Sequence, residues 1–169
     1  AMTLLQQELS DQLLRDGGHQ ERSASYHLLM LDRLVELGES LQARRHEHPR
    51  WLLQSVERMA AWATAIELQG GGFPRFNDSA ADACRPLDAV SASAQRYLAP
   101  AALQRPQTVH QPQAALIDLP ETGWTLLRPG HGWELAFKCG IPCPPHLAAH
   151  AHSDLLSFDL WHHGQPVIA

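Results

Sequence analysis

The sequence predicts an α+β protein in which the helices come first and the strands follow. Apolar residues recur at helical spacing through the first part of the chain, up to the glycine run at residues 70–72. From Ala114 onward the pattern changes to short, β-rich runs broken by Gly or Pro turns. Helices followed by antiparallel strands form two segregated layers or two domains, and both arrangements stay open.

Two helices are expected before residue 45. Leucines spaced i, i+4 and i+8 predict a first helix that ends at Gly17-Gly18, where glycine supplies a left-handed cap. The second helix should run from about residue 26 to residue 41, with Ser23 or Ser25 as its N-cap. Its apolar residues reach most of the way round, which is typical of a helix buried among other helices.

The remaining elements are defined by proline and glycine. A third helix should begin at Pro49 and end before GGGFP at residues 70–74, and another is expected near residues 86–97. Five antiparallel strands are predicted after a linker: AALIDL (114–119), TGWTLLR (122–128), GWELAFKCG (132–140), DLLSFDLWHHG (154–164) and QPVIA (165–169).

Composition excludes several classes of protein. With 169 residues, 44% of them hydrophobic and 18% charged, the chain is globular and suffices for one domain or for pieces of two. The formal charge of -5 gives no general basic field, so no nucleic-acid partner is expected. No apolar run reaches the roughly 18 residues of a membrane span. Three cysteines are too few for a disulfide framework.

Histidines are unusually frequent, and the segment HAHSD holds two of them at H-x-H spacing. On a strand, or a loop entering one, His150 and His152 would point to the same side. Two such imidazoles can share a metal, or one can bind metal while the other moves a proton. Asp154 either adds a third polar group to this site or is a loop-capping carboxylate.

One use of this pattern is a zinc-dependent hydrolase. Metallo-β-lactamase-type enzymes carry H-x-H-x-D-H, but here Leu155 stands where the final histidine is needed. The helical first half also fits that fold badly, so this function remains an alternative only.

A second chemically interesting segment is DGGHQERSASYHLLMLDRL, residues 16–34. Tyr26 opens a buried helix, where free N–H groups favour a nearby anion or phenolate, although a core aromatic with a satisfied hydroxyl is the competing interpretation. Arg22 could pair bidentately with a carboxylate or sulfate of a substrate. A surface salt bridge to Glu21 or Asp16 is the alternative for this arginine.

These two segments, with FPRFNDSA between them, resemble the heparinase II/III-like polysaccharide lyase family. The resemblance covers nearly the whole chain and is weakest from residue 82 to 113. It implies the end of an α/α toroid over residues 1–98, a linker over 99–113 and the start of an antiparallel β-sandwich over 114–169. Both parts would be incomplete in this chain, and the active site would lie between them.

The resemblance also implies roles. The family cleaves uronic-acid-containing acidic polysaccharides by β-elimination, which makes the expected enzyme a carbon–oxygen lyase. Tyr26 matches the family's catalytic tyrosine and His150 its catalytic histidine. His152 matches a ligand of the structural zinc of some members. A non-catalytic glycan-binding or exopolysaccharide-associated homologue stays open. A periplasmic or secreted location is implied, and the oligomeric state is not predicted.

Two further family residues are expected outside residues 1–169. One is the aspartate that completes the zinc site, and the other is the Asn or His that neutralises the substrate carboxylate. The FNDS segment, residues 76–79, is expected to be structural because Asn77 and Asp78 suit an Asx-turn.

Overall fold

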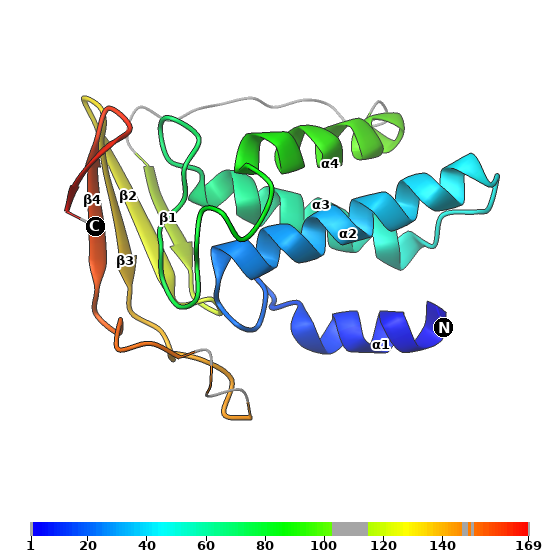
Figure 1. Ribbon diagram of the computed structural model, residues 1–169, viewed down its shortest axis with the longest axis horizontal. Helices are drawn as coiled ribbons and strands as arrows, with labels where there is room; N and C mark the ends of the chain where they lie inside the picture. The colour runs from blue at the N-terminus through cyan, green and yellow to red at the C-terminus, as the bar shows by residue number, and fades with distance from the viewer. Residues whose placement is uncertain (1, 103–114, 147–148, 150, 169) are drawn as a thin grey trace.

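The computed structural model describes residues 2–102, 115–146, 149 and 151–168. Within them, four helices precede one five-stranded sheet, which confirms the α+β class (Figure 1). The helices are α1 (Met2–Gln12), α2 (Ala24–Ala43), α3 (Arg50–Ile66) and α4 (Leu87–Ala102). The strands are β1 (Ala115–Leu119), β2 (Trp124–Gly130), β3 (Trp133–Lys138), β4 (Phe158–His162) and β5 (Gln165–Ile168).

Local sequence signals set most helix ends. Ser23 is the N-cap of α2, and its hydroxyl accepts the Tyr26 N–H at 3.4 Å. Helix α3 begins at Arg50, one residue after the predicted start, and Pro49 is its N-cap. The first helix ends at Gln12 rather than at Gly17. Its chain turns early because the Leu14 N–H donates to the Gly18 carbonyl at 2.9 Å, which closes a turn instead of another helical bond.

Helices α2, α3 and α4 pack against one another around a common core. Gly38 of α2 faces the ring of Tyr97 of α4, and a Cβ at Gly38 would lie 2.3 Å from that ring. Helix α4 continues to Ala102, so the boundary expected at residue 98 falls inside a helix.

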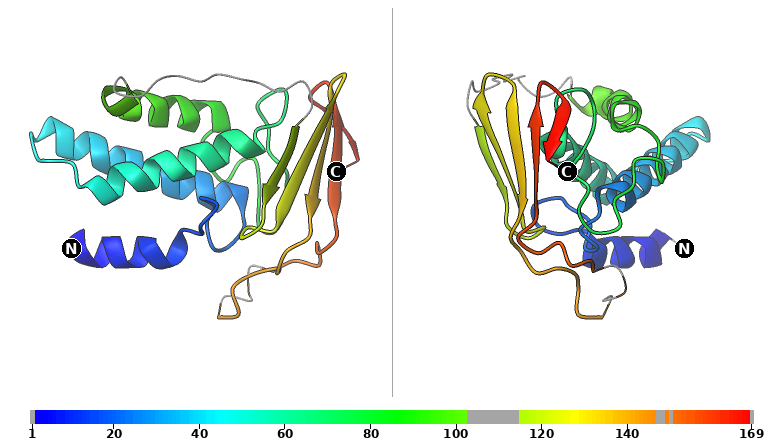
Figure 2. Two further views of the ribbon diagram at one scale, coloured as in Figure 1. Left: turned by 180° about the vertical axis from the view of Figure 1, so that it is seen from behind. Right: turned by 60° about the vertical axis from the view of Figure 1, so that its left-hand side comes forward.

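The sheet is an antiparallel meander with the strand order β1-β2-β3-β4-β5. It stands across one end of the helices, which all lie on the same side of it (Figures 1 and 2). Trp124 of β2 is fully buried, with its ring centroid 5.3 Å from that of Trp62 in α3 and 5.1 Å from that of Phe76. The helices and the sheet therefore share one hydrophobic core.

The opposite face of the sheet also carries large apolar side chains. Strand alternation buries Leu126 but leaves Leu127 41% exposed, and Leu116 and Phe158 are 69% and 44% exposed. The described residues form a single layer of sheet, and the second layer of the expected β-sandwich is not among them. No helix in the described ranges is long and apolar enough to cross a membrane.

Candidate active site

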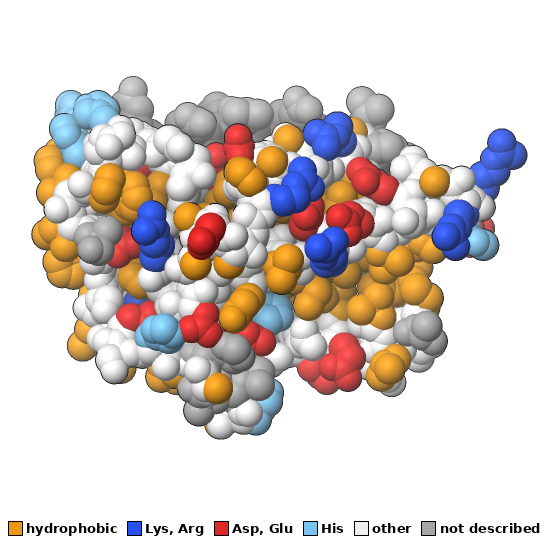
Figure 3. Space-filling view, viewed as in Figure 1, with side chains coloured by type: hydrophobic (Ala, Val, Ile, Leu, Met, Phe, Trp, Pro, Cys, Tyr) orange, Lys and Arg blue, Asp and Glu red, His pale blue; other side chains and the backbone are white. Residues whose placement is uncertain are grey.

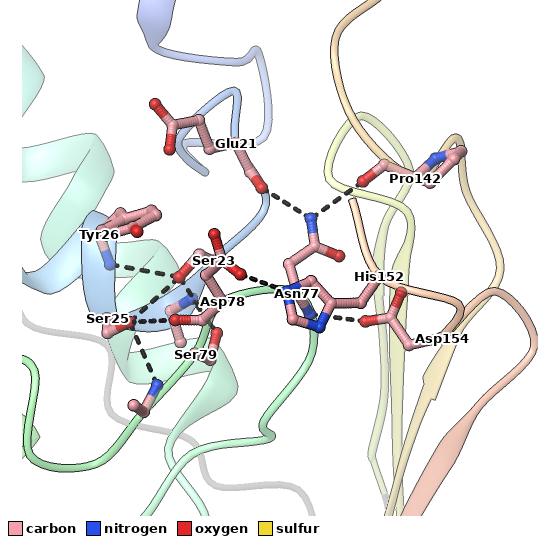
Figure 4. Close-up of polar contacts among 12 residues, drawn as sticks. Glu21, Ser23, Ser25, Tyr26, Asn77, Asp78, Ser79, Pro142, His152 and Asp154 are labelled. Atoms are coloured by element: carbon pink, nitrogen blue, oxygen red, sulfur yellow. Dashed lines mark hydrogen bonds and ion pairs between the residues drawn. The ribbon is translucent and has the colours of Figure 1, made fainter. Parts of the chain in front are cut away.

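The predicted tyrosine and histidine segments meet where the N-terminus of α2 approaches the loop between β3 and β4 (Figure 4). Tyr26 lies in the first turn of α2 and is partly exposed. Its side chain helps to line a hollow of about 410 Å³. Other lining residues are His19, Glu21, Leu29 and Met30. Apolar side chains are exposed between α1 and α2 on this face, with charged and histidine side chains around them (Figure 3).

Asp78 connects the two segments. Its Oδ1 contacts Nε2 of His152, which comes from the β3–β4 loop. Partial burial, the charges of Asp78 and Glu21, and a side-chain hydrogen bond to Asp78 together raise the pKa of the Tyr26 phenol. One carboxylate thus lies between a tyrosine from the helical part and a histidine from the sheet part.

His150 lies outside the described residues. Its expected place near Tyr26 and the expected common orientation of His150 and His152 both stay predictions. The HAHSD segment was expected on a strand or a loop entering one, and the described residues around it form a loop, since β4 begins only at Phe158.

The segment that carries Asp78 is bound to the sheet through its main chain. Three of its N–H groups each donate to a carboxylate from the sheet side: Gln69 to Glu134 at 2.7 Å, Arg75 to Asp159 at 3.1 Å, and Asn77 to Asp154 at 2.6 Å. We call residues 67–79 the strap, because they run from the end of α3 along the sheet to the N-terminus of α2.

Asn77 is the most connected residue of the strap. Its backbone has φ +54°, a left-handed conformation that asparagine tolerates. Its amide nitrogen donates to the carbonyls of Glu21 at 2.8 Å and Pro142 at 2.9 Å, and its amide oxygen accepts from Lys138. The structural role expected for Asn77 is therefore met by cross-links between three chain segments.

Lys138 and Asp154 form an ion pair at 2.6 Å beneath Asn77. The Lys138 side chain is fully buried, and this burial lowers its pKa while the hydrogen bond and charge of Asp154 oppose the shift. Of the two roles that the sequence allows for Asp154, a polar group of the site or a loop-capping carboxylate, the structure shows an anchor: it binds Lys138 and the Asn77 N–H of the strap.

The loop before Tyr26 is fastened to the β1–β2 turn. Thr122 is fully buried and donates to Asp16 through its backbone N–H at 2.6 Å and its hydroxyl at 3.0 Å. Trp62 in turn donates its indole N–H to the Thr122 hydroxyl at 3.1 Å. The carboxylate of Asp16 is thus engaged with Thr122.

Arg22 lies in this fastened loop and is only 5% exposed. Its guanidinium donates to the carbonyls of Gln20 at 3.0 Å and Glu121 at 3.2 Å, and its Nε donates to no acceptor among the described residues. Burial lowers its pKa, and the nearby carboxylates of Asp16 and Glu121 oppose this. The structure gives Arg22 a buried linking position, and its contact with substrate stays a prediction.

Zinc was expected at His152. Structural zinc is usually held by four ligands, but among the described residues no group of three His, Cys, Asp or Glu could hold a metal. The acidic neighbour of His152 is Asp78. The described residues alone therefore do not fit a zinc site, and the metal role of His152 stays a prediction.

His19 belongs to the same hollow, although sequence reasoning did not select it. It is 5% exposed, its ring faces the Gln12 side chain at 3.4 Å, and burial lowers its pKa to about 4. It is therefore neutral at pH 7. No spacing signal pointed to it, because its position depends on the early end of α1.

Fold and site together define a class: an α+β protein with a Tyr–Asp–His arrangement where its helical and sheet layers meet. The chain belongs to the heparinase II/III family. Residues 1–99 match the model of the heparinase II/III N-terminus, and residues 111–169 match that of the heparinase II/III-like C-terminal region.

Solved structures agree on the fold. The crystal structure of a heparinase III superposes with a TM-score of 0.75 at 16% identity, covering 97% of this chain and 29% of that chain. A mutant of the heparan sulfate lyase HepC from Pedobacter heparinus gives a TM-score of 0.71 at 22% identity, with coverages of 97% and 27%. This chain thus spans less than a third of the length of either structure. No curated protein matched the sequence.

Proposed function

We propose that the protein containing this chain is a polysaccharide lyase that cleaves a uronic-acid-containing acidic polysaccharide by β-elimination. The observation that supports this most directly is the placement of Tyr26. It is partly exposed and lines a hollow between α1 and α2, and the Asp78 carboxylate contacts His152 of the histidine loop. The shared family and the heparan sulfate lyase among the similar structures point to the same reaction.

The reaction needs two proton transfers. A base removes the proton from C5 of the uronate, the C4–O bond breaks, and a double bond forms between C4 and C5. The leaving O4 oxygen takes up a proton. Because the C5 proton is poorly acidic, the adjacent carboxylate must be neutralised first, and the enolate-like charge needs preorganised donors.

We assign the proton donation to Tyr26 and the proton removal to His150. A phenol with a raised pKa is protonated at neutral pH, as a general acid must be before it reacts. After donation the phenolate would lie at the N-terminus of α2, where the helix dipole favours negative charge. Histidine suits the base role because it titrates near neutrality.

The test uses the intact protein and a panel of uronate polymers, beginning with heparan sulfate and including alginate and bacterial exopolysaccharides. Elimination creates an unsaturated uronate that absorbs in the ultraviolet, so absorbance should rise with one or more polymers. New reducing ends without absorbance would indicate a hydrolase instead. Binding without cleavage would indicate a non-catalytic glycan-binding protein. The matched control is Tyr26→Phe, which keeps the ring and removes the proton donor.

A further inference from the structure

We propose that Asn77, oriented by the buried Lys138, is a positioning residue for the lyase reaction. It fixes the separation of two segments: residues 13–23, which lead into Tyr26 and which we call the tyrosine loop, and residues 139–157, the histidine loop. The inference rests on the proposed function, in which proton-transfer groups from both parts of the chain act at one sugar ring. It gives a role in the reaction to a residue that sequence reasoning treated as purely structural.

The side chain of Asn77 bridges the two loops directly. Its amide nitrogen donates to the carbonyl of Glu21 in the tyrosine loop at 2.8 Å and to the carbonyl of Pro142 in the histidine loop at 2.9 Å (Figure 4). Asn77 is only 6% exposed, so water competes little for these bonds. The separation of the two carbonyls is therefore set by a single amide group.

Asn77 also holds the histidine loop on both sides of position 150. Pro142 precedes that position, and Asp154 follows it and accepts the main-chain N–H of Asn77 at 2.6 Å. These contacts do not use the side chain of His152, so they hold whether or not that residue binds a metal. One residue of the strap thus anchors the chain before and after the histidine segment.

Lys138 explains why the amide of Asn77 faces this way. The ammonium group has donors only, so the Asn77 oxygen faces it and the nitrogen is turned toward the two carbonyls. Lys138 is the only lysine among the 169 residues, and its side chain is fully buried against its ion-pair partner Asp154. Apolar residues can often replace a buried ion pair without loss of stability. We therefore infer that the contribution of Lys138 is to orient Asn77.

A second attachment between the loops lies at the β1–β2 turn. The carbonyl of Gly123 accepts from the N–H groups of Cys139 and Gly140 at 2.8 and 3.1 Å, and a Cβ at Gly140 would lie 2.3 Å from the Gly123 Cα. The adjacent Thr122 holds Asp16 of the tyrosine loop. One attachment alone would act as a hinge, whereas this turn and the amide bridge together fix both separation and orientation.

The expected consequence is kinetic. Tyr26 and His150 are assigned to one sugar ring, so the separation of the two loops sets the reacting geometry. A misplacement of about 1 Å can reduce the rate about 10²-fold. Because the misplaced groups act on the reacting atoms, kcat should fall while KM changes little.

The kinetic test compares Asn77→Asp with wild type in the intact protein. The carboxylate keeps an oxygen toward Lys138 and suits the left-handed backbone, but it has no N–H for the carbonyls of Glu21 and Pro142. We expect kcat to fall about 10- to 100-fold with little change in KM. Asn77→Gly, which adopts the same φ and adds no buried charge, should show the same loss. An unchanged kcat in either folded variant overturns the inference.

Asp159→Asn is the matched control. Asp159 is also a largely buried carboxylate, and it holds the strap to β4 by accepting the main-chain N–H of Arg75. If Asn77 only stabilises the strap, Asp159→Asn should lower kcat as much as Asn77→Asp does, and the inference fails. If our inference is correct, only the Asn77 variants lower kcat at an unchanged KM.

A second measurement does not depend on activity. Hydrogen exchange of peptides from the tyrosine loop and the histidine loop reports how readily each loop opens. In Asn77→Gly both loops should exchange faster than in wild type, and in Asp159→Asn neither should. Unchanged exchange of both loops in Asn77→Gly overturns the inference. If the intact protein shows no lyase activity, the proposed function fails, while hydrogen exchange still decides whether Asn77 ties the two loops together.

Discussion

At the scale of single residues, Tyr26 can be distinguished from an ordinary core aromatic. Tyr26→Phe keeps the ring packing and loses one hydroxyl, whose hydrogen bond is worth about 1 kcal/mol. A lost proton donor reduces the rate by typically 10²- to 10⁴-fold, or roughly 3 to 5 kcal/mol of barrier. We expect the variant of the intact protein to melt within a few degrees of wild type and to be nearly inactive. A folded variant with near-normal lyase rate would show a packing role only.

His150 should behave in the same way. Because it is assigned to the other proton transfer at the same sugar ring, His150→Ala should also be folded and nearly inactive. The double variant with Tyr26→Phe should lose little more than either single variant, since residues that act as a unit are not additive. Steady-state lyase rates of the four proteins test this, and multiplicative losses would mean that the two residues act independently.

Two buried histidines should make the fold sensitive to acid. Burial lowers the pKa of His27 to about 3 and that of His19 to about 4, from 6.5 in the unfolded chain. Below pH 6.5 the unfolded state binds protons that the folded state does not. The free energy of unfolding is therefore unaffected by these histidines above pH 6.5. Below pH 6.5 it decreases as the pH falls, by up to about 1.4 kcal/mol per pH unit for each histidine.

The measurement is the melting temperature between pH 7.5 and 4. It should fall steadily below pH 6.5 in wild type. His19→Gln, which keeps a polar group opposite Gln12, should show a shallower fall. Parallel curves for the two proteins would mean that His19 titrates normally in the folded state.

Sequence reasoning identified residues whose signals are local. Ser23 could be recognised as a cap, and Tyr26 as the opening of a helix, from a few neighbouring letters. The contact of Asp78 with His152 spans 74 positions, so no local pattern contains it. The burial of Arg22 was equally hidden, because arginine is rarely buried without a charged partner and its carbonyl partners come from tertiary structure.

At the scale of elements, the packing of α2 on α4 depends on Gly38. A Cβ there would meet the Tyr97 ring at 2.3 Å and its hydroxyl oxygen at 2.5 Å. We expect Gly38→Ala to destabilise the protein by about 1–3 kcal/mol, as overpacking does. Thermal melting tests this against Gly72→Ala, where a Cβ would meet nothing within 4 Å. Equal melting temperatures of the two variants would contradict close packing at Gly38.

The strands were easier to predict than the loop that holds the histidines. Each of the five predicted runs overlaps one of the observed strands, because turn residues separate them and apolar residues fill them, although β2 continues to Gly130, past the predicted end at residue 128. The HAHSD segment precedes such a run, but the backbone N–H of Leu156 donates to Lys138 and that of Ser157 to Asp154, which closes a turn before β4. Because the acceptor of the Leu156 N–H, the Lys138 carbonyl, is distant in sequence, this turn could not be predicted from local composition.

At the scale of the whole molecule, the order of helices and strands was predictable, but the packing of both around one hydrophobic core was not. The sequence pattern allows both two layers and two domains, and the structure shows one core in which Trp124 packs against Trp62 and Phe76. The apolar outer face of the sheet, with Leu116, Leu127 and Phe158 exposed, fits the β-sandwich that the family resemblance implies, in which a second sheet covers such a face.

The attachment of the strap through its main chain determines which of its positions tolerate substitution. The sheet carboxylates grip main-chain N–H groups, while the side chains of Gln69 and Arg75 are exposed. Almost any residue supplies the same N–H group, so the side chains at positions 69 and 75 can change while the attachment of the strap persists. Proline is the exception, because it has no N–H to give. Gln69→Ala should therefore leave the melting temperature unchanged. Gln69→Pro should lower it by several degrees, because Glu134 Oε2 loses the strap N–H while Oε1 keeps its bond from Arg128. An unchanged melting temperature for Gln69→Pro would show that this hydrogen bond is dispensable.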